Sequence, residues 1–132
     1  MIYLVISCWI LAAICNAVMD TIAFKYKRSI FKNLNSQYWN PAKSWRNKYK
    51  NKMVFNGHAF IGSTTVLSFL TDAWHLFQFL SNSFLALSVV IIYHETVNQN
   101  LWYSLGLFII LKMIWGIIFE SFYSKLFRKE VY

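Results

Sequence analysis

The stretch that decides the fold is MIYLVISCWILAAICNAVMDTIAF, residues 1–24, which holds a single charged side chain, Asp20, and ends abruptly at Lys25. A transmembrane helix needs about 20 predominantly apolar residues. A secretory signal peptide begins with basic residues, and nothing before Lys25 is basic. We therefore expect a retained membrane span. Cys8 and Cys15, seven residues apart on one face of this helix, are expected to be small packing residues.

The composition of the whole chain agrees with a membrane protein. Of the 132 residues, 58% are hydrophobic and 20% aromatic, whereas 14% are charged. Soluble domains contain about a quarter of charged residues. No Gly-, Ser- or Pro-rich tract divides the chain. We expect an all-α, polytopic integral membrane protein that forms a single membrane domain over residues 1–132.

Basic residues are concentrated directly after the first span. Residues 25–52 contain nine of the thirteen Lys and Arg residues and no Asp or Glu. The positive-inside rule places such a segment in the cytoplasm and the N-terminus outside. The cytoplasmic loop is expected to cover about residues 25–62.

Two further spans are expected after this loop. Residues 53–93 are largely apolar, too long for one straight span and too short for two. We therefore expect a polar segment with two glycines, either interfacial or re-entrant, to be followed by one long helix that spans about residues 65–93. A short outer turn, 94–100, precedes a third span over residues 101–123, and a basic tail follows it. The chain is expected to have about three transmembrane helices and a cytoplasmic C-terminus.

Polar residues inside the apolar runs indicate where a site would lie. Asp72 and His75 stand about one helical turn apart near the start of the second span. In the expected topology, Asp20 and Glu120 reach a similar depth at the inner ends of the other two spans. A charge at the centre of a span costs at least about 2.5–3.5 kcal/mol, so we expect these side chains to form a polar pocket open to the cytoplasm. Lys112, deeper in the third span, is expected to form an intramembrane ion pair with an acid on a neighbouring helix.

This pocket has two chemical interpretations. An Asp and a His three residues apart can act as an anchored general base or can supply two ligands to a metal ion. The candidate catalytic residues are Asp72, His75, Glu120 and Asp20. The candidate metal ligands are His75, Asp72 and His58. No HExxH, GxSxG or Walker motif accompanies them and no cofactor is identified, so a hydrogen-bonded cluster that only orients the helices is the simpler interpretation.

The basic loop interleaves its charges with aromatic rings. Beside a bilayer, Tyr and Trp favour the headgroup region, and each Lys or Arg near an anionic leaflet gains about 1 kcal/mol. We therefore expect anionic membrane lipid, rather than nucleic acid, to be the partner of this loop. Asn40-Pro41 predicts a turn. The candidate lipid- or partner-binding residues lie around it and are Trp39, Trp45, Arg46 and Lys48.

Three functions are compatible with these features. The first is a structural or interaction subunit, alone, as a homo-oligomer or in a larger membrane complex. The second is an interfacial enzyme that acts on a lipid or a phosphate-bearing lipid through Asp72 and His75. The third is an oligomeric pore or small transporter, since three spans with an outer N-terminus and a basic inner tail resemble the topology of some phage holins. We expect the first function, because it needs no unproven chemistry.

Overall fold

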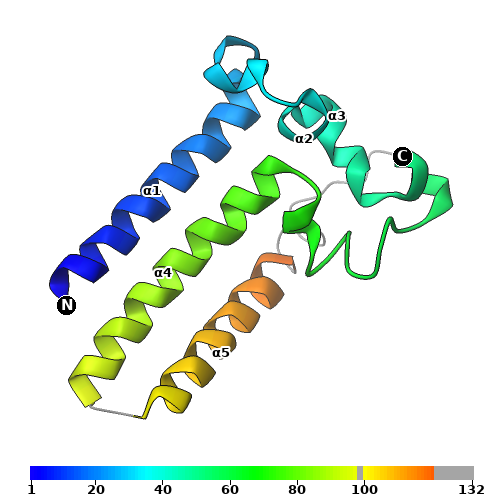
Figure 1. Ribbon diagram of the computed structural model, residues 1–132. Coiled ribbons are helices and arrows are strands. Elements are labelled where there is room, and N and C mark those ends of the chain that lie inside the picture. Colours follow the sequence, from blue (N-terminus) through cyan, green and yellow to red (C-terminus); the bar gives the residue numbers. More distant parts are fainter. Residues whose placement is uncertain (98–99, 121–132) are drawn as a thin grey trace.

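The computed structural model describes residues 1–97 and 100–120, and this part of the chain is helical without a β-strand. Three long helices, α1 (Ile2–Lys25), α4 (Ala73–Val97) and α5 (Leu101–Glu120), lie side by side. Figure 1 shows α4 in the middle, with α1 and α5 on either side. The expected all-α fold class is thus confirmed.

Two of the helices are long and apolar enough to cross a membrane, namely the helical run Ile2–Arg28, which contains α1, and α4. In each of them, 17% of the most apolar window is buried inside the protein. The core helix of a soluble protein would be mostly buried instead. In α5 the described apolar run covers Leu101–Ile110. The last residues of the third expected span and the basic tail, 121–132, lie outside the described residues.

α1 and α4 pack against each other through small side chains. The buried residues of α1 are Cys8, Ala12, Cys15 and Ile22. On α4, Ser81 and Ser88 are buried, and the Ser81 hydroxyl donates to the carbonyl of Ala12 at 3.1 Å. Small residues let two helix backbones approach closely, which is how helices associate in membranes. The packing role expected for Cys8 and Cys15 is confirmed, because both are buried and free.

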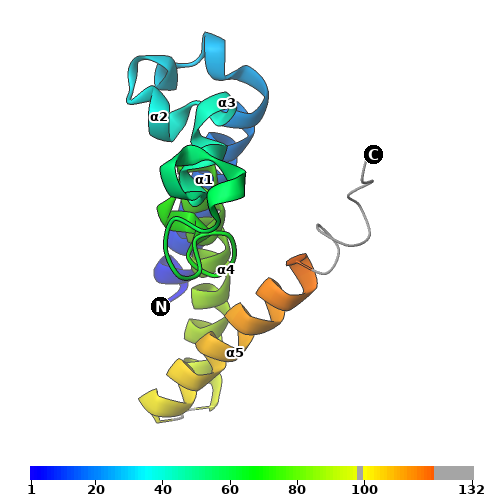
Figure 2. The ribbon, with the colours of Figure 1, turned by 90° about the vertical axis from the view of Figure 1, so that its right-hand side faces the viewer.

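α5 packs on the other side of α4, with polar contacts at two levels. Near the turn between the helices, Nδ1 of His94 lies 2.9 Å from the hydroxyl of the buried Ser104. Further along α5, Lys112 reaches Phe79 and Ser83 of α4. Figure 2 shows α5 inclined to the other two helices, with its C-terminal end leaning away from them.

α4 begins at Ala73 rather than near residue 65, which corrects the expected start of the second long helix. Asp72 caps it, because Oδ1 accepts the backbone N–H of His75 at 2.9 Å. The Asp72 carbonyl accepts the first intrahelical bond, from Leu76 N–H, at 3.1 Å. Aspartate is among the most favourable N-cap residues. Before it, Gly62 adopts a φ of 83° within a series of turns, a conformation that ends any helix there.

The residues between α1 and α4, 26–72, form what we call the connecting segment, which is folded into short helices. These are η1 (Tyr26–Arg28), η2 (Ile30–Asn33), α2 (Ser36–Trp39), α3 (Pro41–Ser44), η3 (Trp45–Lys48), η4 (Lys50–Lys52), η5 (Val54–Asn56) and η6 (Ser68–Leu70). Side-chain oxygens of Ser29, Asn35 and Asn40 accept backbone N–H groups at the starts of η2, α2 and α3. The expected Asn40-Pro41 turn is therefore the capped start of α3, with Pro41 in its first position.

Candidate functional site

The side chain of Asp72 is hydrogen-bonded on both oxygens at the start of α4, where the residue is 3% exposed. Its oxygens lie 2.9 and 2.7 Å from Nδ1 of His75, and Oδ2 also accepts from the Thr71 hydroxyl at 3.2 Å. An ionised carboxylate only accepts hydrogen bonds, so Nδ1 carries the hydrogen. The contact between Asp72 and His75 that their spacing suggested is present within the first turn of one helix.

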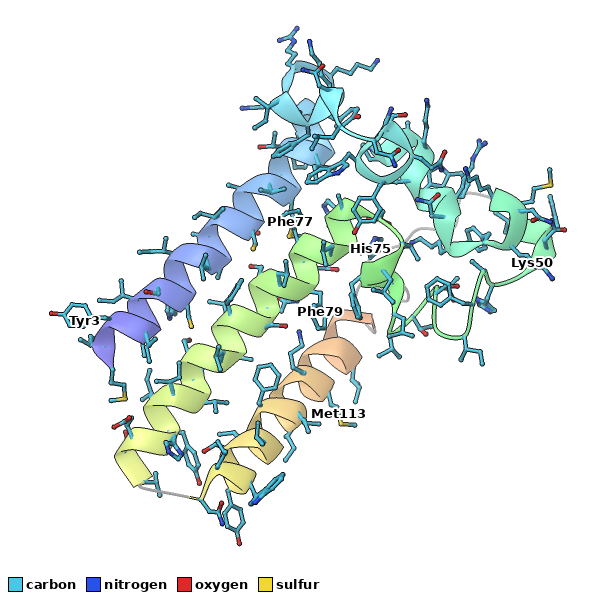
Figure 3. The ribbon with its side chains drawn as sticks, viewed as in Figure 1. Tyr3, Lys50, His75, Phe77, Phe79 and Met113 are labelled. Carbon is cyan, nitrogen blue, oxygen red and sulfur yellow. The ribbon has the colours of Figure 1, made fainter. Side chains whose placement is uncertain are left out.

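His75 turns partly outward from this cluster. Its side chain is 25% exposed, and the Trp74 ring meets it edge-on with centroids 5.0 Å apart. Because Asp72 holds Nδ1, the other nitrogen, Nε2, is the one left to accept a proton or bind a ligand. We find no hydrogen bond to Nε2 from residues 1–97 and 100–120. Figure 3 shows His75 and Phe79 on the side of α4 toward α5 and Lys50.

Asn47 ties the connecting segment to the same end of α4. Its Nδ2 donates to the carbonyls of Gln37 and Thr71, both at 2.8 Å. Its Oδ1 accepts from Nε2 of Gln37 at 2.7 Å. Thr71 lies 24 residues further along the chain, so Asn47 joins α2 and η3 to the residue just before the Asp72 cap. Sequence reasoning missed Asn47, because nothing in a basic, aromatic run shows where an amide finds its partners.

Aromatic side chains complete this junction. Trp39 stacks on Phe31 at 5.0 Å between ring centroids and contacts Phe77 of α4 at 5.8 Å. Burial and the nearby negative charge of Asp72 raise the pKa of the Tyr38 phenol. These contacts place α2 against the first turns of α4.

The predicted lipid- or partner-binding residues divide between two places. Trp39 belongs to the junction with α4. Trp45 and Arg46 are exposed, and the Arg46 guanidinium lies 5.2 Å from the centroid of the Trp45 ring, in a cation–π contact. Lys48 lies beside them at the end of η3, and its carbonyl accepts from the buried Ser63 hydroxyl at 2.7 Å.

Two other predicted pocket residues that the structure describes, Asp20 and His58, form no hydrogen bond with Asp72. Asp20 is exposed on α1. His58 is exposed in the connecting segment, where Nδ1 lies 2.8 Å from the Thr64 hydroxyl. Glu120 ends α5, and its side chain lies outside the described part. Within that part, no group of three or more His, Cys, Asp and Glu side chains could hold a metal ion. Among the described residues, Asp72 and His75 lie at a junction between α4 and the connecting segment.

Lys112 contacts neutral groups of α4 where an acidic partner was expected. Its ammonium donates to the Ser83 hydroxyl at 2.9 Å and to the Phe79 carbonyl at 3.3 Å. It also lies 4.1 Å from the centroid of the Phe79 ring. Each of these groups presents negative potential to a cation. The expected ion pair is therefore replaced, among the described residues, by contacts with a carbonyl, a hydroxyl and an aromatic face.

The geometry of this junction supports two uses. It fastens the connecting segment to α4, and it presents one imidazole nitrogen that an aspartate orients. No protein-family model, curated protein or solved structure matches this chain. The choice between the two uses therefore depends on the residues themselves.

Proposed function

We propose that the protein is a small integral membrane protein with a structural or interaction role. Its three long helices cross the bilayer with the N-terminus outside, and its connecting segment contacts anionic lipid on the cytoplasmic side. The observation that carries the proposal is the use made of Asp72, whose carboxylate contacts lie within residues 71–75 and begin α4. A carboxylate whose hydrogen bonds cap a helix has a structural role, and this role requires no reaction.

The arrangement of charge supports the proposed topology. The connecting segment carries eight Lys and Arg residues, and Lys25 ends α1 beside it. α5 runs back toward that same end of the molecule (Figure 1). In the sequence, a tail with three basic residues follows α5. Both basic regions are thus attached at one end of the helices, as the positive-inside rule requires of a single cytoplasmic side.

Labelling of introduced cysteines in intact cells tests this topology. In a Cys8→Ala, Cys15→Ala background, Tyr3→Cys should react with a membrane-impermeant maleimide added outside. Lys27→Cys should react only after the cells are permeabilised. Both positions are exposed in the protein, so a lack of reaction reports the membrane and not burial. Reaction of Lys27→Cys in intact cells would overturn the orientation.

Retention of lipid tests the contact with anionic headgroups. We expect native mass spectrometry, after extraction from a mixture of zwitterionic and anionic lipids, to show retained anionic lipid. The triple change Lys48→Gln, Lys50→Gln and Lys52→Gln should reduce it, by about 1 kcal/mol per charge removed. The matched control replaces the same lysines with arginine. Equal retention in the glutamine and arginine variants would contradict the proposal.

One observation favours a second candidate, an interfacial enzyme that acts on a lipid or a phosphate-bearing lipid. Asp72 fixes Nδ1 of His75, whose side chain is partly exposed, and Nε2 is then the nitrogen that can accept a proton, as in an anchored general base. The change His75→Gln separates the two functions. An enzyme would remain folded and abundant while the membrane lipid profile changes. A structural subunit would leave the lipid profile unaltered and lose abundance or assembly instead.

A further inference from the structure

Just before α4, residues 60–70 expose apolar side chains from an irregular backbone. We call these residues, FIGSTTVLSFL, the apolar turn; they contain no acidic or basic side chain. Ile61 is 94% exposed and Val66 is 81% exposed. The other exposed apolar side chains of the turn are Phe60, Leu67 and Leu70. An exposed apolar surface of this kind, outside the long helices, indicates contact with a membrane or with another protein.

The backbone of the apolar turn is hydrogen-bonded within itself. Gly62 accepts from the N–H groups of both Thr65 and Leu67, at 3.0 and 2.9 Å. Further bonds to carbonyls three residues back are donated by the N–H groups of Ser63, Ser68, Leu70 and Thr71. The Ser63 hydroxyl is buried and donates to Lys48. Five of the eleven backbone N–H groups of the turn are therefore bonded within it. Water and lipid headgroups can bond the others at the interfacial level, so the turn need not lose all contact with polar partners there.

The apolar turn folds back along α4 instead of pointing away from it. Phe69 stacks on Phe79 with ring centroids 4.3 Å apart and planes 18° apart. Phe79 lies six residues into α4, about 9 Å along the axis. α4 has 25 residues, or about 37 Å, whereas the hydrocarbon core is about 30 Å thick. When α4 spans a bilayer, Phe79 therefore lies near the boundary between headgroups and acyl chains, and the apolar turn lies at that level.

The surface next to the apolar turn is cationic. Residues 48–59 form a small hairpin, in which Lys50 N–H bonds to the Gly57 carbonyl and Ala59 N–H to the Lys48 carbonyl, both at 2.9 Å. The lysines of this hairpin are Lys48, Lys50 and Lys52. Figure 1 shows this part of the chain, in green, to the side of the start of α4. Apolar side chains flanked by lysines match an anionic bilayer surface, into which they insert by about 5–10 Å.

We propose that the apolar turn inserts into the interfacial layer of the membrane beside α4. Ile61, Val66 and Leu70 contact acyl chains there, while the lysines of the hairpin contact lipid phosphates. This inference rests on the membrane placement of α4 in the proposed function. It adds a third kind of membrane contact to spanning helices and charged headgroup binding, namely a shallow apolar anchor.

Depth-dependent quenching of a fluorophore tests the anchor. Single cysteines are placed by Ile61→Cys and Val66→Cys in a Cys8→Ala, Cys15→Ala background and labelled with an environment-sensitive fluorophore. The labelled full chain is reconstituted in vesicles of phosphatidylcholine and phosphatidylglycerol. Two matched positions serve as controls, Phe24→Cys on the exposed face of α1 and Lys50→Cys on the hairpin; all four side chains are exposed, so the label does not disturb packing.

We expect lipids brominated on the acyl chain to remove most of the emission at the Ile61, Val66 and Phe24 positions, and iodide in the water to quench the Lys50 position. Quenching of the Ile61 and Val66 positions by iodide alone would overturn the anchor while leaving the proposed function standing. Protection of these two positions from both quenchers would also overturn it, because protein would then cover the turn. Iodide quenching at the Phe24 position would instead show that α1 does not lie in the bilayer, and this result would contradict the proposed function itself.

Discussion

A carboxylate inside an apolar run is costly to bury unless its hydrogen bonds are satisfied. Asp72 satisfies its two oxygens with the backbone N–H and Nδ1 of His75 and with the hydroxyl of Thr71. One side chain thereby caps a helix backbone and orients an imidazole. The two contributions can be separated, since a cap needs only an acceptor whereas the pairing with His75 gains from charge.

The first prediction separates the cap from the charge. Asp72→Ala should lower the free energy of unfolding by about 1–2 kcal/mol, because it removes the acceptor at the start of α4. Asp72→Asn should cost less, since asparagine caps helices about as well as aspartate. Denaturant titrations followed by circular dichroism in mixed micelles measure both, with Asp20→Asn on the exposed face of α1 as a control. Equal losses for Ala and Asn would show that the charge, and not the cap, stabilises α4.

The second prediction concerns alkaline pH. Because the pKa of Tyr38 is raised in the folded protein, the unfolded chain loses the phenol proton first. The stabilisation is complete below about pH 10, the ordinary pKa of tyrosine, and is lost as the pH rises through the folded value. Tyr38→Phe should therefore retain more of its thermal stability than the natural chain when the buffer changes from about pH 8 to about pH 11. Tyr3→Phe, an exposed control, should show no such gain.

Whether the contacts of a residue could be predicted from sequence depended on how many residues separate it from its partners. The three-residue spacing of Asp72 and His75 gave their contact correctly, because both lie in one helical turn. Asn47 has partners 10 and 24 residues away, and Lys112 has partners 29 and 33 residues away. No local pattern contains that information. The expected acidic partner for Lys112 followed from charge alone, whereas its partners among the described residues are a carbonyl, a hydroxyl and a ring.

Between elements, the contact of α1 with α4 depends on side-chain size. Ala12 is buried and its carbonyl accepts from Ser81, whereas the next residue, Ala13, is exposed. Ala12→Leu should push the helices apart and cost about 1–3 kcal/mol. The matched change Ala13→Leu should cost almost nothing. Faster maleimide labelling of Cys8 and Cys15 in mild detergent reports the separation, and equal rates in the two variants would contradict this interface.

The contact of α5 with α4 leads to a prediction of increased stability, whereas the changes above are expected to lower it. Lys112→Met removes a charge whose contacts in the described part of the chain are with neutral groups, and Ser83 keeps its own bond to the Phe79 carbonyl at 2.7 Å. Replacing such a charge with an apolar side chain of similar size should stabilise the protein in lipid by about 1–3 kcal/mol. Thermal unfolding in vesicles measures the change, with the exposed Lys27→Met as control. A clear loss of stability would mean that an acid does pair with Lys112.

The elements themselves were easier to predict than their ends. Long apolar runs indicated three long helices, and the described residues contain three, α1, α4 and α5. The start of α4 could not be read from hydropathy, since the residues before Ala73 are as apolar as those after it. Their bends are fixed by Gly62 and by the cap at Asp72, which are features of backbone geometry and hydrogen bonding.

For the whole molecule, part-buried hydrogen bonds of Asn47 and the ring contact of Trp39 with Phe77 join the connecting segment to the start of α4. Asn47→Asp replaces an amide donor with a carboxylate that faces two carbonyls, and should cost about 1–3 kcal/mol. We expect trypsin then to cleave the connecting segment faster, while the long helices stay protected. Asn33→Asp, at the exposed end of η2, is the matched control. Unchanged cleavage in Asn47→Asp would show that other contacts suffice to hold the segment.

The placement of α4 between α1 and α5 has a consequence for permeation. The three long helices form a single layer, about one helix diameter or 10 Å thick, from which the C-terminal end of α5 leans away. The described parts of these three helices therefore enclose no route for ions or water within a single copy. Any conducting path would have to be bordered by several molecules standing around a common axis, so a single copy isolated in a nanodisc should leave the bilayer electrically sealed.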